Sequence, residues 1–462
     1  MHIGIVGLGV SGIAFINAMI HKKDDVEITV FEPNELSNHR AFGIVDDLLI
    51  CNTSAAVMSV NLSEAREFQQ FLGITNGSRV FPQRAQYGDY LQSVVAGFSS
   101  CVRKITDSVV AVTDLTTKVE VETLTSGFFA FDILIITGSN KVPVIPEVCD
   151  LHRPYIPIFA SPYDVDYSQW LVENKGATVG ILGTGLSGID AARLALFREV
   201  GVIMVSPSGR LPGVRSSLHY ESPIHINVDD FVSNSTSPEL FHRFLREMCA
   251  KVGYDIRNHR AIPGSSSIAR FVHDYEECLA GESKWEFLVG PMIDMANKYW
   301  SGGNSMMRQR LLSSLEGVIR RRVTAIPLRS AYDLNKGVHD SMFYVSAGLG
   351  DGVPVGRKVA LESVSSKMPP IDALVCACGY SSAGWINDKG KLCPSEFVSQ
   401  SKQAVVCDPL PGGWGATAFS RRVLCVGSAA SGNTAIPNYV RASVVQSSIV
   451  ADMIADNDCS LP

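Results

Sequence analysis

The chain has 462 residues, of which 46% are hydrophobic and 19% are charged, with a formal net charge of −6. This composition excludes a disordered or fibrous protein, and the length favours two or three domains over a single hydrophobic core. The mild charge and the lack of a block rich in lysine or arginine argue against nucleic acid as a partner.

The first residues predict a strand, a glycine turn and a helix. Residues 2–6 are apolar and β-prone, Gly7, Gly9 and Gly12 follow in the pattern G-x-G-x-x-G, and residues 13–20 have the apolar spacing of a buried helix. In such a turn one glycine makes the bend, the next admits a pyrophosphate, and the last lets the helix lie close to the strand. The pattern predicts a dinucleotide site at a helix N-terminus.

A second predicted strand, residues 26–33, supports this interpretation. It ends in Glu32, whose carboxylate can hydrogen-bond an adenosine ribose. The alternative is a glycine turn that only packs a helix. The order of strand, turn, helix and terminal acid favours the nucleotide site.

Residues 177–196 repeat the arrangement, with Gly183, Gly185 and Gly188 between a predicted strand and a predicted helix. The strand that follows ends at Ser206 instead of an acid. The sequence therefore contains two dinucleotide-binding turns that differ at the end of the next strand.

Ser208 and Arg210 lie just beyond this second strand. A carboxylate there would repel a 2′-phosphate, whereas the hydroxyls of Ser206 and Ser208 and the guanidinium of Arg210 can hold one. The second site is therefore predicted to take NADPH in preference to NADH. The alternative for Arg210 is an ordinary surface arginine.

Two nucleotide sites in one chain imply a hydride donor and an acceptor, and FAD is the usual acceptor. Residues 131–139 and 371–382 each read as an acid, an apolar strand, a small residue and a glycine, Gly138 and Gly379. Such strands return the chain to the sheet edge near a bound dinucleotide. Residues 421–455 predict a further strand, glycine turn and helix.

The eleven cysteines are scattered and include no C-x-x-C pair, which argues against a disulfide framework and against a metal site of the zinc type. Cys376 and Cys378 are two residues apart in an apolar run, so they are predicted to face the core together. The N-terminus lacks a signal-peptide pattern, and there is no apolar stretch of membrane-spanning length. We expect a cytoplasmic protein without a membrane partner.

With these motifs the chain resembles the two-dinucleotide-binding FAD/NAD(P)H flavoproteins, and within them the group related to flavin-dependent N-hydroxylating monooxygenases. Closer similarities lie at residues 48–61, 81–91 and 206–213. The resemblance implies an α/β fold with two Rossmann-like dinucleotide-binding domains, one for FAD and one for NADPH, and a mainly helical insertion.

The resemblance places residues 48–61 along the flavin and residues 81–91 at a helix beside it. It implies Asn52, Met58 and Gln83 as candidates for the reactive face of the site. For each of them, packing or a role in a turn is the alternative.

The resemblance also implies cofactor contacts at Gly427 and Ser428, with one departure. Many flavoproteins of this kind have Asp after the late glycine, and here it is Ser428, whose hydroxyl can still donate a hydrogen bond. The fingerprint F-x-G-x-x-x-H-x-x-x-W of ketone-oxygenating relatives is not present, because residues 159–170 have its terminal aromatics without its Gly and His. This disfavours oxygenation of a ketone or a sulfur atom.

These features divide the chain into an FAD-binding domain, residues 1–155 and 357–462, and an NADPH-binding domain, residues 171–356. A helical insertion at about 231–322 is too long to be a simple connection. It begins with Ser237 followed by proline, a typical helix start. We interpret it as a region that shapes the substrate site, with an oligomer contact or a buttress as the alternatives.

An amino-acid substrate would require a guanidinium that binds its carboxylate in a bidentate pair. Arg308 and Arg310, in the predicted helix after a glycine-rich turn, and Arg257 or Arg260 are the candidates. The residues do not decide among them, because arginine on a helical surface is common.

The resemblance implies a monooxygenase that uses FAD, NADPH and O₂ and N-hydroxylates a small amine or amino acid through a C4a-hydroperoxyflavin. The alternatives are an NADPH-dependent flavoprotein reductase or dehydrogenase, a C- or S-oxygenating monooxygenase, and a non-catalytic flavin-binding scaffold. The partner is then a small molecule, and homo-oligomerisation is left open.

Overall fold

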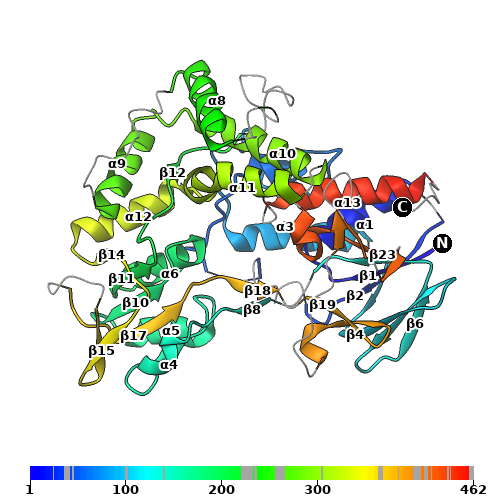
Figure 1. The fold of residues 1–462 in the computed structure, drawn as a ribbon, viewed down its shortest axis with the longest axis horizontal. Coiled ribbons are helices and arrows are strands. Elements are labelled where there is room, and N and C mark those ends of the chain that lie inside the picture. Colours follow the sequence, from blue (N-terminus) through cyan, green and yellow to red (C-terminus); the bar gives the residue numbers. More distant parts are fainter. Residues whose placement is uncertain are drawn as a thin grey trace.

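The computed structural model describes residues 1–456 apart from positions 24, 36–41, 44–45, 99–101, 139–140, 220–232, 234–236, 255–265, 303–304, 363–367, 383, 399–406, 410–414, 418, 434–435 and 437–438. Figure 1 shows two α/β lobes and a helical layer that covers one side of both. In the described part of the chain, no helix is long and apolar enough to cross a membrane.

The first lobe is built on a sheet with the strand order β21-β22-β23-β7-β1-β2-β3. Its strands from β23 to β3 run parallel. Nearly all residues of β1 and β7 are apolar and buried, as expected for parallel strands covered on both faces. The bounds are β1 (His2–Val6), β2 (Glu27–Phe31), β3 (Val102–Ile105), β7 (Ile133–Ile136), β21 (Cys407–Pro409), β22 (Gly415–Thr417) and β23 (Ser420–Cys425).

Helices and a second sheet complete this lobe. The helices α1 (Val10–Ile20) and α13 (Val440–Ala455) pack against each other, and their buried side chains share one core with β1 and β2. This lobe also contains α2 (Glu67–Phe71) and α3 (Arg84–Phe98). An antiparallel sheet has the order β19 (Trp385–Asp388), β20 (Lys391–Pro394), β4 (Val109–Asp114), β5 (Val119–Thr123) and β6 (Phe128–Phe131).

The second lobe has a five-stranded parallel sheet with the order β14-β11-β10-β17-β9. Its strands are β9 (Ile158–Phe159), β10 (Thr178–Leu182), β11 (Gly201–Ser206), β14 (Phe343–Ala347) and β17 (Ala373–Cys376). Its helices are α4 (Val148–His152), α5 (Val165–Glu173), α6 (Leu186–Phe197) and α12 (Leu328–His339), and a hairpin joins β15 (Gly352–Val355) to β16 (Lys358–Leu361). The predicted α/β class with two Rossmann-like sheets is confirmed.

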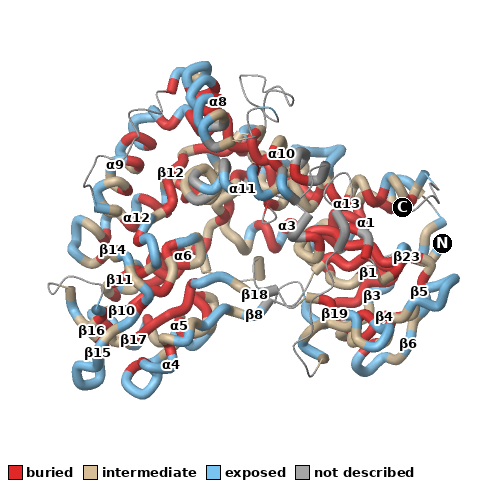
Figure 2. Tube along the Cα trace, viewed as in Figure 1, coloured by how far each residue is buried: buried red, intermediate tan, exposed pale blue. Residues whose placement is uncertain are grey.

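The helical layer is the expected insertion, and the short parallel pair β12 (Val214–Arg215) and β13 (Ile326–Pro327) marks its two ends. It contains α8 (Pro238–Lys251), α9 (Ser267–Leu279), α10 (Glu286–Gly302), α11 (Ser305–Val318) and a π-helical turn (Ile319–Val323). Ser237 caps α8, as predicted, because its side chain accepts a hydrogen bond from the Leu240 N–H. Figure 2 shows that the buried parts of the chain run through both sheets and into this layer.

The return to the first lobe lies later in the chain than residue 357. The strand β17 pairs with β10, so it belongs to the second lobe. The two connections between the lobes run side by side, because β8 (Lys141–Pro143) and β18 (Tyr380–Ser382) pair in antiparallel fashion. Figure 1 shows this pair between the lobes. The apolar run of β17 does not itself indicate which sheet it joins, which is why the boundary at 357 was wrong.

Candidate dinucleotide sites

In both sheets the chain order reverses beside the strand that precedes a glycine turn. In the first lobe β1 lies between β2 and β7, and in the second lobe β10 lies between β11 and β17. Ligands of open α/β sheets bind at the carboxyl ends of the strands at such a switch point. Gly7 follows β1 and Gly183 follows β10, so both turns occupy this position.

The first turn has the backbone geometry that a dinucleotide requires. Gly7 adopts a positive φ of 98° and donates its N–H to the Phe31 carbonyl over 2.9 Å. A Cβ at Gly12 would lie 2.3 Å from the Gly7 carbonyl oxygen, so only glycine lets α1 approach β1 this closely. A Cβ at Gly9 would meet no protein atom within 4 Å. The backbone at Gly9 is therefore open to a ligand.

Glu32 is fixed at the end of β2, beside this turn. Its side chain is 8% exposed, and its Oε2 accepts the Leu8 N–H over 2.9 Å while Oε1 accepts the Asn34 N–H over 3.1 Å. Carboxylate oxygens have further lone pairs after one such bond. The carboxylate can therefore hold the turn and accept from ribose hydroxyls, as predicted for a dinucleotide site.

The third side of the first turn comes from the ends of β7 and β23. The Thr137 hydroxyl donates to the Gly7 carbonyl over 2.9 Å, and Gly138 follows it. Gly427, with a positive φ of 62°, donates its N–H to Gln446 over 2.8 Å. The Ser428 hydroxyl donates to the Thr137 carbonyl over 3.4 Å, so it would have to turn away to donate to a phosphate. The structure thus brings Gly138, Gly427 and Ser428 to the same sheet edge.

The glycines of the second turn have the same backbone geometry as those of the first. Gly183 has a φ of 114° and donates its N–H to Val205 over 2.7 Å. A Cβ at Gly188 would lie 2.3 Å from the Gly183 carbonyl oxygen, whereas a Cβ at Gly185 would meet nothing within 4 Å. The second turn is therefore also open at its middle glycine and closed at its last one.

Hydroxyls and a guanidinium surround the end of β11. Ser206 Oγ lies 2.9 Å from Thr184 Oγ1 in a shared hydrogen bond and also accepts the Gly209 N–H over 3.1 Å. Ser208 and Arg210 are exposed beside it, and among the described residues the Arg210 guanidinium has no ion-pair partner. This edge therefore presents donors without a carboxylate, which suits a phosphate group.

The end of β17 closes the other side of the second turn. A Cβ at Gly183 would lie 2.3 Å from the Ala377 carbonyl oxygen, and Gly379 follows with a φ of 91°. Cys376 is buried, but Cys378 is exposed because the strand ends between them. The expectation that both cysteines face the core is wrong for Cys378. Cys376 instead contacts Cys149, with 3.4 Å between the sulfur atoms.

The three candidates for the reactive face differ in their burial. Ile50 pairs with Gln83 in an antiparallel bridge, so the segments that carry Asn52 and Gln83 run side by side. Both side chains are half-buried. Met58 is 1% exposed and belongs to the core of the first lobe, so its burial fits the packing alternative better than a catalytic role.

The candidate substrate arginines do not form one site either. Arg308 on α11 donates its Nε–H to the Trp300 carbonyl over 3.0 Å and lies over the Trp300 ring, while Arg310 is exposed. Residues two apart on a helix do not face the same way. Arg257 and Arg260 lie outside the described residues.

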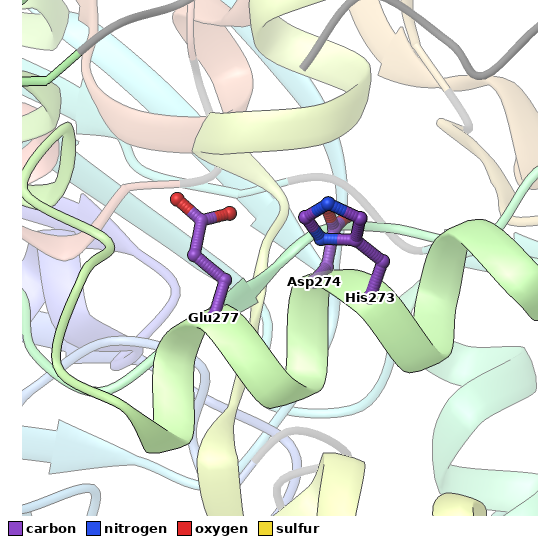
Figure 3. Close-up of side chains that lie close together, drawn as sticks. All are labelled: His273, Asp274 and Glu277. Atoms are coloured by element: carbon purple, nitrogen blue, oxygen red, sulfur yellow. The ribbon is translucent and has the colours of Figure 1, made fainter. Parts of the chain in front are cut away.

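One cluster in the insertion has metal-binding residue types. Figure 3 shows His273, Asp274 and Glu277 on α9, with their ligand atoms within 4.8 Å of one another. Asp274, however, forms an ion pair with Arg321. This cation already neutralises the carboxylate, so the cluster is explained as part of the packing of the insertion.

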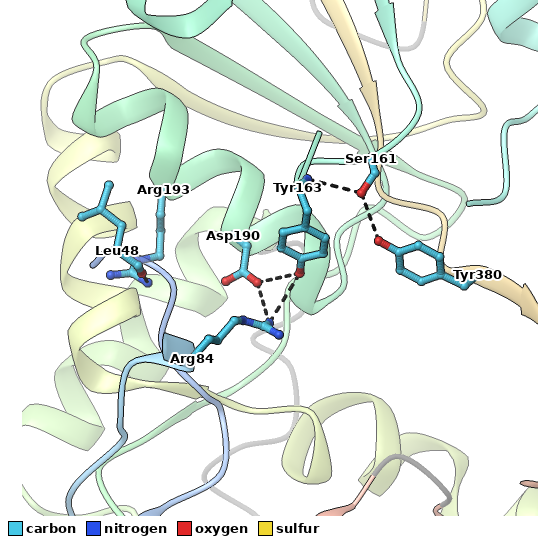
Figure 4. Close-up of polar contacts among 7 residues, drawn as sticks. All are labelled: Leu48, Arg84, Ser161, Tyr163, Asp190, Arg193 and Tyr380. Carbon is cyan, nitrogen blue, oxygen red and sulfur yellow. Dashed lines mark hydrogen bonds and ion pairs between the residues drawn. The ribbon is translucent and has the colours of Figure 1, made fainter. Parts of the chain in front are cut away.

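A polar cluster between the lobes was missed by the sequence analysis. Arg84 at the start of α3 donates to Asp190 on α6 over 2.7 Å, and the Tyr163 hydroxyl donates to the same carboxylate oxygen over 2.8 Å. Figure 4 shows these side chains converging from three segments. Burial is the largest single influence on Arg84 and opposes its charge, but the Asp190 carboxylate and the neighbouring Tyr163 and Cys51 together raise the pKa of Arg84. The available signal was a pair of charged residues, Asp190 and Arg193, within a mainly apolar helix.

The comparisons with known proteins agree with this geometry. Residues 4–141 match the family model described as FAD-NAD(P)-binding. A sequence search of curated proteins found no match.

Solved structures match over nearly the whole chain. L-lysine 6-monooxygenase from Pseudomonas syringae is 14% identical with a TM-score of 0.54, and the match covers 98% of each chain. Cyclohexanone monooxygenase bound to ε-caprolactone is 13% identical with a TM-score of 0.53, covering 99% of this chain and 88% of that one. OTEMO in complex with FAD and NADP is 11% identical with a TM-score of 0.51, covering 99% and 84%. Residues 4–141 thus match a family model for FAD-NAD(P)-binding, and the chain shares its overall fold with these solved structures.

Proposed function

We propose that this protein is an FAD- and NADPH-dependent monooxygenase that N-hydroxylates a small amine or amino acid. The observation that carries the proposal is the pair of glycine turns at two switch points, one beside the buried Glu32 and the other beside Ser206 and Arg210. A ribose-binding acid suits FAD, and donors without an acid suit the 2′-phosphate of NADPH.

The residues present fit both nucleotides. Gly9 leaves room for a pyrophosphate at the N-terminus of α1, and Glu32 would accept from the ribose of FAD. Gly185 leaves the same room at α6, where Ser208 and Arg210 would bind the 2′-phosphate. The remaining candidate contacts for FAD and NADPH are Gly138, Gly379, Gly427 and Ser428. Bound FAD supplies the chemistry of accepting a hydride and activating O₂.

The chain's own part in the reaction is to position the substrate and exclude water. Val57 shares a core with Leu218 and with helices of the insertion, and the Ser54 hydroxyl donates to the Leu218 carbonyl over 2.6 Å. The insertion therefore packs against residues 54–57, part of the segment 48–61 that the proposal places along the flavin. Such packing would keep water from an oxygen-transferring site.

The substrate's nitrogen must arrive unprotonated to act as a nucleophile. Asn52 and Gln83 offer amide groups that can orient an amine without holding it as an ammonium ion. The similarity to an L-lysine 6-monooxygenase along the full length of both chains supports nitrogen as the oxygenated atom.

The similarity to cyclohexanone monooxygenase favours a second candidate, oxygenation of a carbonyl compound. The segment 159–170 speaks against it. In this chain Ser161 stands at the position of the fingerprint's Gly and shares a hydrogen bond with Tyr380 over 3.0 Å, and Val165 stands at the position of its His. We also propose a cytoplasmic location, because the odd number of cysteines without a C-x-x-C pair suits a reducing compartment.

Stopped-flow spectroscopy of the FAD-loaded protein tests this proposal. NADPH should bleach the flavin, and O₂ should then produce a transient absorbing species before the oxidised spectrum returns. Small amines and amino acids should shorten its lifetime, and mass spectrometry should detect a product that has gained one oxygen atom.

The other outcomes are distinct. Reduction by NADPH without a transient species would indicate a reductase. A lifetime that shortens only with ketones or thioethers would indicate C- or S-oxygenation. No reduction at all would indicate a flavin-binding scaffold.

A further inference from the structure

A buried ion pair joins the two lobes next to the second turn. We propose that Arg84 and Asp190 are positioning residues, whose contact holds α6 and a nicotinamide nucleotide at its N-terminus in register with the flavin lobe. The inference rests on the proposed function, because it assumes that hydride passes between the two sites.

The contact is well placed for this role. Asp190 lies two residues after Gly188, in the first turns of the helix that begins at the second glycine turn. Its side chain is 8% exposed and that of Arg84 is 18% exposed, so water screens the pair little. Arg84 also lies 3.4 Å from the Tyr163 hydroxyl, which comes from the loop between β9 and α5 of the second lobe. Figure 4 shows all three side chains meeting at one point.

The same face of α6 holds a second part of the flavin lobe. Arg193, three residues after Asp190, donates to the Leu48 carbonyl and to Asp333. The Leu49 carbonyl accepts the Arg84 N–H over 2.8 Å, so the contacts of Asp190 and Arg193 both end on one paired segment. That segment, residues 46–52 with 82–84, carries Asn52 and Gln83.

Different parts of the molecule would bind the nucleotide and position its nicotinamide ring against the flavin. The phosphates of the nucleotide would be held by the second lobe alone, through the turn at Gly185 and the end of β11. The distance from nicotinamide to flavin depends on how the lobes sit against each other. Loss of the ion pair should therefore slow hydride transfer far more than it weakens nucleotide binding.

The first test measures flavin reduction by saturating NADPH in Arg84→Ala. We expect the rate constant to fall about tenfold or more, with the Kd for NADP⁺ changed by less than about twofold. Arg84→Lys, which keeps the charge, should restore part of the rate, and so should the exchanged pair Arg84→Asp with Asp190→Arg. Rates within about twofold of the wild type in Arg84→Ala would overturn the proposal.

Arg198→Ala is the matched control. Arg198 at the end of α6 forms an interlobe ion pair with Asp46 over 3.1 Å, and both side chains are about as buried as Arg84. Its partner Asp46 belongs to the same paired segment, but Arg198 lies at the opposite end of the helix from the glycine turn. If both ion pairs only stabilise the fold, the rate of flavin reduction should fall equally in the two variants. The positioning role predicts a loss of rate in Arg84→Ala only.

The second test needs no flavin chemistry. Hydrogen exchange of the apoprotein should show that NADP⁺ protects residues 46–52 as well as the turn at 183–188. In Arg84→Ala the turn should stay protected and residues 46–52 should lose protection. Equal protection in both proteins would overturn the proposal. If NADPH does not reduce the wild-type flavin, the proposed function fails, and hydrogen exchange still decides whether the pair couples the lobes.

Discussion

The two glycine turns share their backbone and differ in what surrounds the end of the next strand. Gly7 and Gly183 both have a positive φ, and the last glycine of each turn leaves no room for a Cβ. Glu32 ends one strand as a buried carboxylate bonded to the turn, whereas Ser206 ends the other among hydroxyls and the exposed Arg210.

This comparison separates two properties of a nucleotide site. The backbone geometry determines that a pyrophosphate can approach a helix N-terminus, and it is the same in both lobes. The residues at the end of the second strand are those expected to contact the ribose, and there the two turns present an acid in one case and hydroxyls with an arginine in the other. Substitutions at the two kinds of position should therefore have different effects.

The largest effect is expected when the shared geometry is broken. Gly12→Ala places a Cβ 2.3 Å from the Gly7 carbonyl oxygen, so α1 must move away from β1. We expect a loss of about 3 kcal/mol in the free energy of unfolding, measured by urea denaturation of the apoprotein.

Gly9→Ala is the control within the same turn, because its Cβ meets no protein atom within 4 Å. It should leave the stability of the apoprotein within about 0.5 kcal/mol and weaken FAD binding. Gly188→Ala and Gly185→Ala should behave as the corresponding pair for NADP⁺. Equal stability losses at Gly9 and Gly12 would show that the open middle glycine has been misassigned.

The next effect concerns the first strand end alone. Glu32→Ala removes the carboxylate that binds the Leu8 N–H and would bind a ribose. The loss of charge-assisted hydrogen bonds should weaken FAD binding by about 2 kcal/mol, or roughly thirtyfold. Fluorescence titration of the apoprotein with FAD measures this, and NADP⁺ affinity should not change. An unchanged FAD affinity would contradict the assignment of the first turn to FAD.

The sequence was sufficient to predict what depends on local pattern. Both turns, the acid at Glu32 and the cap at Ser237 are set by a few adjacent residues, and the structure has them where they were expected. The lobe that contains β17 was not predictable, because an apolar strand fits either sheet. The exposure of Cys378 depends on where that strand ends.

The contact between Arg84 and Asp190 could not be predicted from the sequence either, because it joins residues from two different lobes. The two residues are 106 positions apart in the sequence, and no local sequence pattern around either one predicts that they pair. Met58 shows the reverse: it was predicted to lie beside the flavin, but an apolar residue can equally fill the core, and Met58 is buried there. Pairings between lobes and the direction of side chains follow from packing, which spacing alone does not specify.

The smallest effect is expected at Arg210, where the two turns differ without any consequence for folding. Arg210 is exposed, so Arg210→Ala should leave stability unchanged. If its guanidinium binds the 2′-phosphate, kcat/KM for NADPH should fall about tenfold, as loss of one charge-assisted hydrogen bond predicts, while the value for NADH changes by less than about twofold. Flavin reduction followed with each coenzyme gives both values. Equal effects on NADPH and NADH would remove the phosphate-binding role from Arg210 and leave the hydroxyls of Ser206 and Ser208 as the basis of any preference.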